Sequence, residues 1–213
     1  MNILSERPPE TSAALAALSR ALFRLTGWRA EGCLPNLPKF IVVSAPHTSN
    51  WDGIILVLAA LVFRVRLRYM AKHTLFRPPL GWLVRLTGGI PINRTGRYNA
   101  VEQAAQAFRA HDRLALAIAP EGTRKTVEYW KTGFYYIALE ASVPLVLGYI
   151  DYARRRAGVG PVITPSGDLE ADIAQIRAFY APITGRHPGR MSETRVRPQN
   201  GGLASGGDDS GHA

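Results

Sequence analysis

Cysteine, long apolar runs and, over one stretch, acidic residues are scarce in this chain of 213 residues. The single cysteine, Cys33, excludes an internal disulfide framework and suits a reducing compartment. The longest unbroken apolar run, Ile54 to Phe63, is about half of the ~20 residues that a transmembrane helix needs. The run Met1 to Glu10 carries acidic and proline residues instead of an apolar stretch, so the sequence predicts no secretory signal.

Acidic residues are missing between Asp52 and Glu102, although the whole chain carries a net charge of +10. The basic residues of this stretch are Arg64, Arg66, Arg68, Lys72, Arg77, Arg85, Arg94 and Arg97. Such a block attracts anions, either phosphate head groups or nucleic acid. For most of these residues taken singly, a solvated basic face is the alternative interpretation.

Several catalytic signatures are also absent. The sequence has no Gly-x-Ser-x-Gly elbow, no Gly-x-x-x-x-Gly-Lys phosphate loop and no Cys/His metal cluster. These absences argue against a serine nucleophile of the hydrolase type, a P-loop nucleotide site and a metal centre.

His47 and Asp52 stand in the run Ala45 to Gly53, directly after the apolar run Phe40 to Val43. The apolar run predicts a buried strand, and ligands bind at the carboxyl ends of strands in open α/β sheets. A histidine and a carboxylate at this spacing can form a proton-transfer pair, because the carboxylate holds one ring nitrogen and the other takes a proton. The same residues also fit a turn histidine and an aspartate that only caps a helix.

Three later segments favour the catalytic interpretation: Gly88 to Arg94, Pro120 to Arg124, and Val143 to Gly148. Together with the His-x-x-x-x-Asp element, they resemble in order and spacing the four motifs of the glycerolipid acyltransferase family. That family includes bacterial 1-acylglycerol-3-phosphate acyltransferases. The resemblance covers roughly residues 40 to 150.

The resemblance implies His47 as general base and Asp52 as the residue that orients it, with no metal, no cofactor and no covalent acyl-enzyme. A neutral histidine can take a hydroxyl proton near neutral pH, since its reference pKa is ~6.5. Acyl-CoA or acyl carrier protein is implied as the donor. By the same resemblance, the acceptor's glycerol phosphate is bound by Arg94, Glu121, Gly122, Thr123 and Arg124. Surface salt bridges are the alternative for the two arginines.

Strand and helix patterns alternate through the middle of the chain, which predicts a single-domain αβ sandwich with a largely parallel, mixed sheet. The expected strands lie near 39–45, 65–71, 89–92, 113–119, 143–150 and 159–164. The expected helices lie near 52–63, 78–87, 97–111, 131–141 and 168–180. The acyltransferase domain is expected to span 1–184. Residues 185–213 have almost no bulky apolar side chain and are expected to be a disordered tail.

The N-terminal region, residues 10–30, predicts an amphipathic helix. Leu15, Leu18, Leu22 and Leu25 recur at helical spacing among basic residues, a pattern typical of helices that lie in a bilayer interface. Packing of this helix on its own domain is the alternative. With no spanning segment, the interpretation is a cytoplasmic protein attached peripherally to the inner leaflet.

The pattern leaves the acceptor open. The function predicted is transfer of a fatty acyl group to a lysolipid, with 1-acylglycerol-3-phosphate first and another acceptor, such as a lyso-ornithine lipid, second. A basic lipid- or nucleic-acid-binding protein without catalysis is a third interpretation, but His47, Asp52 and Glu121 argue against lost catalysis. The basic block carries no recognised nucleic-acid motif, so no nucleic acid is expected as partner.

Overall fold

Continuous apolar sequence forms the centre of the main sheet. In the computed structural model, which describes residues 4–5, 10–79, 81–92 and 97–197, three neighbouring parallel strands are β4 (Lys39–Ala45), β7 (Leu114–Ile118) and β8 (Leu145–Asp151). β4 lies between the other two, and most residues of all three are buried. Strands covered on both faces have this kind of sequence, because neither face meets water.

Four further strands extend this centre to a seven-stranded sheet of order β2-β9-β8-β4-β7-β5-β6. They are β2 (Arg29–Glu31), β5 (Leu67–Lys72), β6 (Gly89–Ile92) and β9 (Arg156–Ile163). All neighbouring pairs are parallel except β8 and β9, which are antiparallel. Two short parallel strands, β1 (Leu4–Ser5) and β3 (Cys33–Leu34), form a separate pair.

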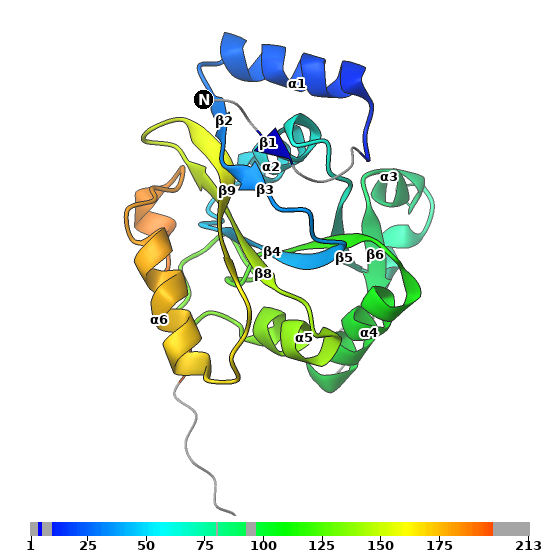
Figure 1. Ribbon diagram of the computed structural model, residues 1–213, viewed down its shortest axis with the longest axis vertical. Coiled ribbons are helices and arrows are strands. Elements are labelled where there is room, and N and C mark those ends of the chain that lie inside the picture. Colours follow the sequence, from blue (N-terminus) through cyan, green and yellow to red (C-terminus); the bar gives the residue numbers. More distant parts are fainter. Residues whose placement is uncertain (1–3, 6–9, 80, 93–96, 198–213) are drawn as a thin grey trace, which may run out of the picture.

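Helices cover both faces of the sheet, so the layers are helix, sheet and helix (Figure 1). On one face, α2 (Asn50–Val62) packs on the sheet and α1 (Ala13–Leu25) packs on α2. The larger core lies on the other face, under α4 (Arg97–Ala110), α5 (Gly133–Ala141) and α6 (Leu169–Tyr180). The short elements are η1 (His73–Phe76) and α3 (Gly81–Leu86) beside β6, and η2 (Pro188–Arg190) near the C-terminal end of the described chain. The predicted αβ sandwich and its mixed, mostly parallel sheet are confirmed.

α1 buries a narrow face and exposes its leucines. Ala16, Ser19 and Phe23 are buried, whereas Leu18 is 56 % and Leu25 83 % exposed. Leu15 and Leu22 are exposed as well. The helix therefore packs on its own domain, and its leucine face stays uncovered by the described residues; the bilayer contact stays a prediction. Within those residues, no helix combines the length and the apolar character needed to cross a bilayer.

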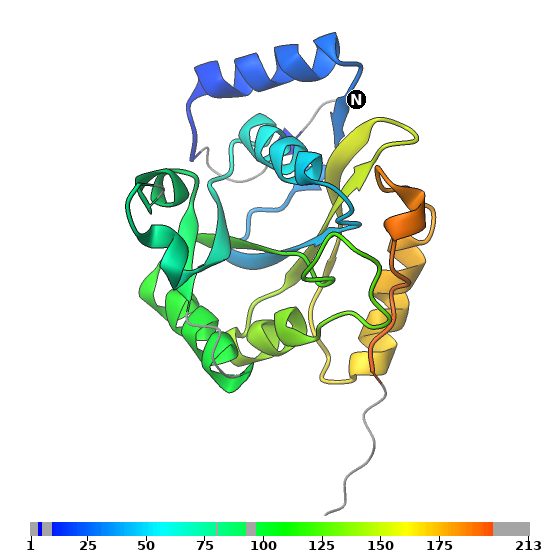
Figure 2. The ribbon, with the colours of Figure 1, turned by 180° about the vertical axis from the view of Figure 1, so that it is seen from behind.

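The predicted disordered tail is wrong for residues 185–197. Figure 2 shows this segment running along α6, and the Arg177 side chain of α6 donates to the Thr194 carbonyl at 2.6 Å. The Trp130 amide donates to the Arg195 carbonyl at 2.8 Å, and Val196 packs against the main core. Hydrogen bonds to the folded domain thus order a segment that is poor in apolar residues. The prediction of disorder rested on apolar composition, which takes no account of such hydrogen bonds. Residues 198–213 lie outside the described part of the chain.

Candidate active site

Three parallel strands end at the same edge of the sheet, and each is followed by a polar side chain of the site. His47 follows β4, Glu121 follows β7 and Tyr152 follows β8. The backbone N–H of His47 donates to Glu121 Oε2 at 2.9 Å, and the Tyr152 hydroxyl donates to Asp52 Oδ1 at 2.7 Å. Parallel strands bring residues from distant parts of the chain together at this edge, where ligands bind in open α/β sheets.

Asp52 lies in the first turn of α2 and is 3 % exposed. It forms a capping box with Ser49, and its Oδ2 accepts from the Thr48 and Ser49 amides at 2.7 and 2.8 Å. Burial alone would raise the pKa of Asp52. The hydrogen bonds from His47, Tyr152, Ser49 and Thr48 outweigh burial and lower that pKa below its ordinary value. Asp52 is therefore an ionised carboxylate at neutral pH.

The His47 ring meets this carboxylate with its Nδ1, which lies 3.4 Å from Asp52 Oδ2. The side chain is 28 % exposed, and none of the residues that the structure describes bonds to its Nε2. A carboxylate partner favours the tautomer with the proton on Nδ1, which leaves the Nε2 lone pair free. The pair has the arrangement needed to take a proton from a ligand.

Glu121 supports the loop of His47 by accepting a hydrogen bond from the His47 amide. It is 1 % exposed, and its Oε1 has no hydrogen-bond partner in the described part of the chain. Burial raises the pKa of Glu121 to about 7, although the hydrogen bond from the His47 amide acts in the opposite direction. The following Gly122 has φ +65, a conformation that favours glycine, and a side chain there would also meet Lys131.

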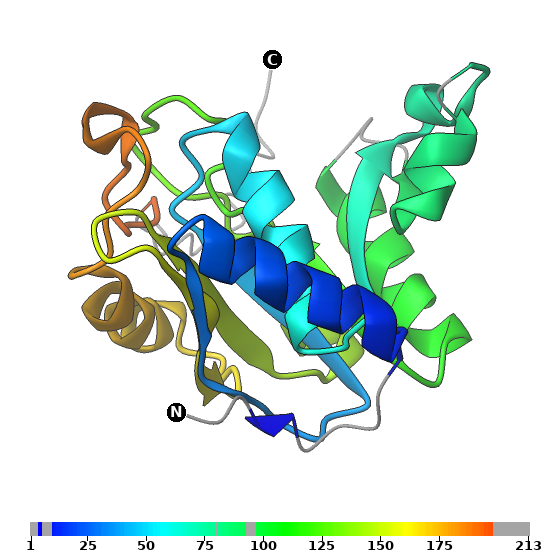
Figure 3. The same cartoon turned by 90° about the horizontal axis from the view of Figure 1, so that it is seen from above.

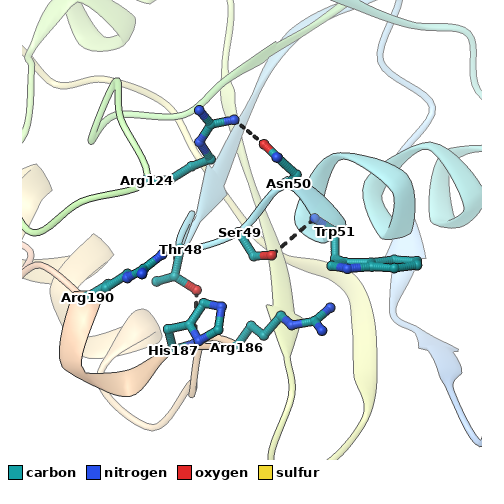
Figure 4. A pocket seen from close by; sticks show the side chains of 8 residues that line it. All are labelled: Thr48, Ser49, Asn50, Trp51, Arg124, Arg186, His187 and Arg190. Atoms are coloured by element: carbon teal, nitrogen blue, oxygen red, sulfur yellow. Dashed lines mark hydrogen bonds between the residues drawn. The ribbon is translucent and has the colours of Figure 1, made fainter.

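A cavity of about 400 Å³ opens beside this pair (Figure 4). Its lining residues are Thr48, Ser49, Asn50, Trp51, Arg124, Arg186, His187 and Arg190. Arg124 donates to the Asn50 side chain across the cavity. The volume lies within the range of small-molecule sites, and the lining is polar and basic.

Comparison with known proteins gives a direct answer on the family. A family model described as Acyltransferase matches residues 32–150, more than half of the chain. The chain belongs to the acyltransferase family. This match confirms the prediction made from the four motifs, and it identifies the chain as an acyltransferase.

The fold of this acyltransferase also occurs in a solved structure, titled as the crystal structure of the 1-acyl-sn-glycerophosphate (LPA) acyltransferase PlsC from Thermotoga maritima. The two share 18 % sequence identity with a TM-score of 0.57, over 80 % of this chain and 77 % of that one. At this identity the likeness concerns the fold alone. Comparison with curated protein sequences gives no significant match.

Of the residues expected in the site of this acyltransferase, the structure brings His47, Asp52 and Glu121 together and places Arg124 in the adjoining cavity. Thr123 is half-buried, and its hydroxyl accepts from the Lys125 amide at 3.4 Å, a contact of the turn itself. Arg94 lies outside the described residues.

The sequence analysis missed four residues of the site: Tyr152, Arg186, His187 and Arg190. Tyr152 follows the carboxyl end of β8, so the rule that pointed to His47 applied to it too. Burial and the bond to Asp52 raise the pKa of the Tyr152 phenol, which keeps it protonated as a donor. Its ring meets the edge of Trp28, just after α1, at 5.0 Å between centroids. The three basic residues belong to the segment expected to be disordered.

Glu121→Gln is expected to change how stability depends on pH. Glu121 has a pKa of 4.5 when exposed and about 7 when folded, so the folded state keeps a proton that the unfolded state has lost between those values. The free energy of unfolding of the wild type therefore falls by about 3 kcal/mol as pH rises through this window, and no further above it. Glutamine does not titrate and removes this contribution.

Denaturant unfolding of both proteins from pH 4 to 8 measures the effect. The free energy of unfolding of the variant should rise relative to that of the wild type as pH rises. Glu140→Gln is the matched control, because Glu140 is an exposed carboxylate on α5 whose side chain is 57 % accessible. Parallel curves for wild type and Glu121→Gln would contradict the assignment.

Proposed function

We propose that this acyltransferase moves a fatty acyl group from acyl-CoA or acyl carrier protein to the free hydroxyl of 1-acylglycerol-3-phosphate or a related lysolipid. One observation carries the proposal: the buried, ionised Asp52 contacts His47 Nδ1, while Nε2 has no bonding partner among the residues that the structure describes. The acceptor is taken from the motifs and from the PlsC protein that shares this fold.

The chemistry needs no nucleophile from the protein. His47 Nε2 takes the proton of the acceptor hydroxyl, and the oxygen attacks the thioester carbonyl carbon. The tetrahedral intermediate then collapses, the C–S bond breaks, and the imidazolium returns its proton to the leaving thiolate. Asp52 stabilises the imidazolium through Nδ1 without accepting the proton, since its pKa is lowered. The products are an ester and a free thiol.

His47→Ala should abolish transfer while the fold persists. Loss of a general base costs about 10²–10⁴-fold in kcat. Asp52→Asn should also be severely impaired, because an amide no longer favours the Nδ1–H tautomer. The measurement is release of free thiol from acyl-CoA with a panel of lysolipids as acceptors.

The control for this series is His111→Ala, since His111 is exposed and its ring nitrogen Nδ1 hydrogen-bonds to the Ala107 carbonyl of α4 at 2.9 Å. Circular dichroism verifies that each variant is folded. A folded His47→Ala protein with near-normal turnover would remove His47 from the mechanism.

Recognition of the acceptor's phosphate is assigned to Arg124 and, from the motif, to Arg94. A guanidinium fork matches a phosphate well, and charge-assisted hydrogen bonds contribute about 1.5–3 kcal/mol each. Arg124→Ala and Arg94→Ala should each raise the acceptor KM about tenfold to a hundredfold and change the donor KM much less. Steady-state kinetics with each substrate varied in turn measures this, and equal effects on both substrates would count against it.

We also propose that this acyltransferase docks on the bilayer that holds its lipid substrates, through the leucine face of α1. Four exposed leucines form that face, with Arg20 and Arg24 on the same helix. Further exposed apolar side chains stand on α2 (Trp51, Ile54, Val57) and α3 (Trp82, Leu86). Figure 3 shows α1 lying across α2, whereas α3 stands apart from both, beside β6. Because the proposed donors, acyl-CoA and acyl carrier protein, are cytoplasmic molecules, the proposed docking is at the inner leaflet.

Leu18→Glu combined with Leu25→Glu should weaken binding to anionic liposomes by more than about tenfold, because inserting two leucines supplies a few kcal/mol. Transfer to a short-chain, water-soluble acceptor should stay as in the wild type. Co-sedimentation at low and high salt measures the docking, and wild-type binding should be only partly released by salt. Leu139→Glu is the control, since Leu139 is exposed on α5 under the opposite face. Equal binding by all three proteins would mean that docking uses another surface.

A further inference from the structure

The cavity beside His47 is built from two distant parts of the chain. One wall is the start of α2, from Thr48 to Trp51, and the other wall carries Arg186, His187 and Arg190 around η2 (Figure 4). Arg124, from the loop after β7, completes the lining. The second wall lies beyond residues 32–150, so it is outside the part of the chain that the family model matches.

The charge of this cavity is of one sign. Among the residues that the structure describes, its lining includes three arginines and no acidic residue. Arg186 has its guanidinium carbon 5.3 Å from the centre of the Trp51 ring, a cation–π contact. Within the described ranges, neither Arg186 nor Arg190 has a carboxylate at salt-bridge distance. Arginines gathered in one cavity repel one another, and a bound anion reduces that repulsion.

The wall that carries these arginines is fixed directly to the loop of His47. The His187 amide donates to the Thr48 hydroxyl at 3.2 Å, and the Tyr152 amide donates to the Thr184 carbonyl at 2.8 Å. A Cβ on Gly185 would lie 3.0 Å from Thr48 Cγ2 and 3.1 Å from Pro46 Cγ, so the Gly185 backbone lies close against these two side chains. The distance between the arginines and the base is therefore set by the fold.

We propose that Arg186 and Arg190 bind the phosphate of the acceptor together with Arg124, so that the C-terminal segment supplies half of the headgroup site. This inference rests on the proposed function and adds two binding residues to it. Two guanidinium forks in addition to that of Arg124 match the several oxygens of a phosphate monoester.

The position of the cavity favours the acceptor's phosphate over those of the donor. In a 1-acylglycerol-3-phosphate, only one methylene and one ester oxygen separate the carbon of the free hydroxyl from the phosphorus. A hydroxyl at His47 Nε2 therefore keeps its phosphate close by, and the cavity begins at the residue after His47. The phosphates of CoA are separated from its thioester by the whole pantetheine arm, so they lie farther from the base.

The test uses Arg186→Ala, Arg190→Ala and the matched control Arg197→Ala. Arg197 belongs to the same C-terminal segment but contacts Tyr129, with its guanidinium carbon 5.8 Å from the ring centre, outside the cavity. Each of the first two variants should raise the KM for a phosphorylated acceptor about tenfold, with less than about twofold change for a monoacylglycerol or for the donor. Arg197→Ala should match the wild type.

A binding measurement separates this inference from the proposed chemistry. Isothermal titration calorimetry measures the binding of glycerol 3-phosphate, inorganic phosphate and CoA to His47→Ala variants. The binding measurement does not depend on turnover. Binding of glycerol 3-phosphate that weakens about tenfold on loss of Arg186 or Arg190 supports the site, even if His47→Ala retains transfer and the proposed mechanism fails. Weaker binding of CoA alone would assign the cavity to the donor, and unchanged binding of all three probes would leave the two arginines as solvated charges. Either result overturns the inference.

Discussion

Asp52 keeps an ionised carboxylate almost out of reach of water, and the start of α2 is built around it. A buried charge is costly unless it is paired and hydrogen-bonded, and here the His47 ring, two backbone amides and the Tyr152 hydroxyl all contact it. The same carboxylate caps the helix and orients the ring of His47. The same carboxylate therefore supports both the start of the helix and the position of the base. It also ties the loop from His47 to Ser49 to the start of α2.

Two carboxylates stand near one histidine, and their surroundings drive their pKa values apart. Asp52 has donors for both oxygens and a lowered pKa, whereas Glu121 has a donor for one oxygen only and a pKa raised to about 7. Different environments of this kind let neighbouring acids take different roles at one pH. Asp52 is suited to stabilising a positive imidazole ring, and Glu121 to holding the backbone of the His47 loop through its hydrogen bond to the His47 amide.

Much of the fold and the centre of the site could be predicted because both depend on local sequence. Alternation of apolar runs and helical patterns indicated the sandwich, and the polar residues after the run Phe40 to Val43 indicated the edge of the sheet where His47 lies. The ordering of residues 185–197 could not be predicted, because it depends on hydrogen bonds to elements far away in the chain, such as that from His187 to Thr48. Tyr152 could have been suspected from its place after a strand, but its partner could not: the contact with Asp52 joins residues 100 positions apart.

The contact between Trp28 and Tyr152 has a practical consequence for handling the protein. Phe23 of α1 packs near Trp28, Trp28 meets the Tyr152 ring edge-on, and Tyr152 donates to Asp52. Aromatic rings are rigid, so a detergent or a tag that lifts α1 from α2 also withdraws support from the carboxylate behind the base. Purification conditions that look harmless, because they leave every motif residue intact, would then lower the specific activity. A comparison of preparations should accordingly monitor tryptophan fluorescence, to which Trp28 contributes, alongside turnover.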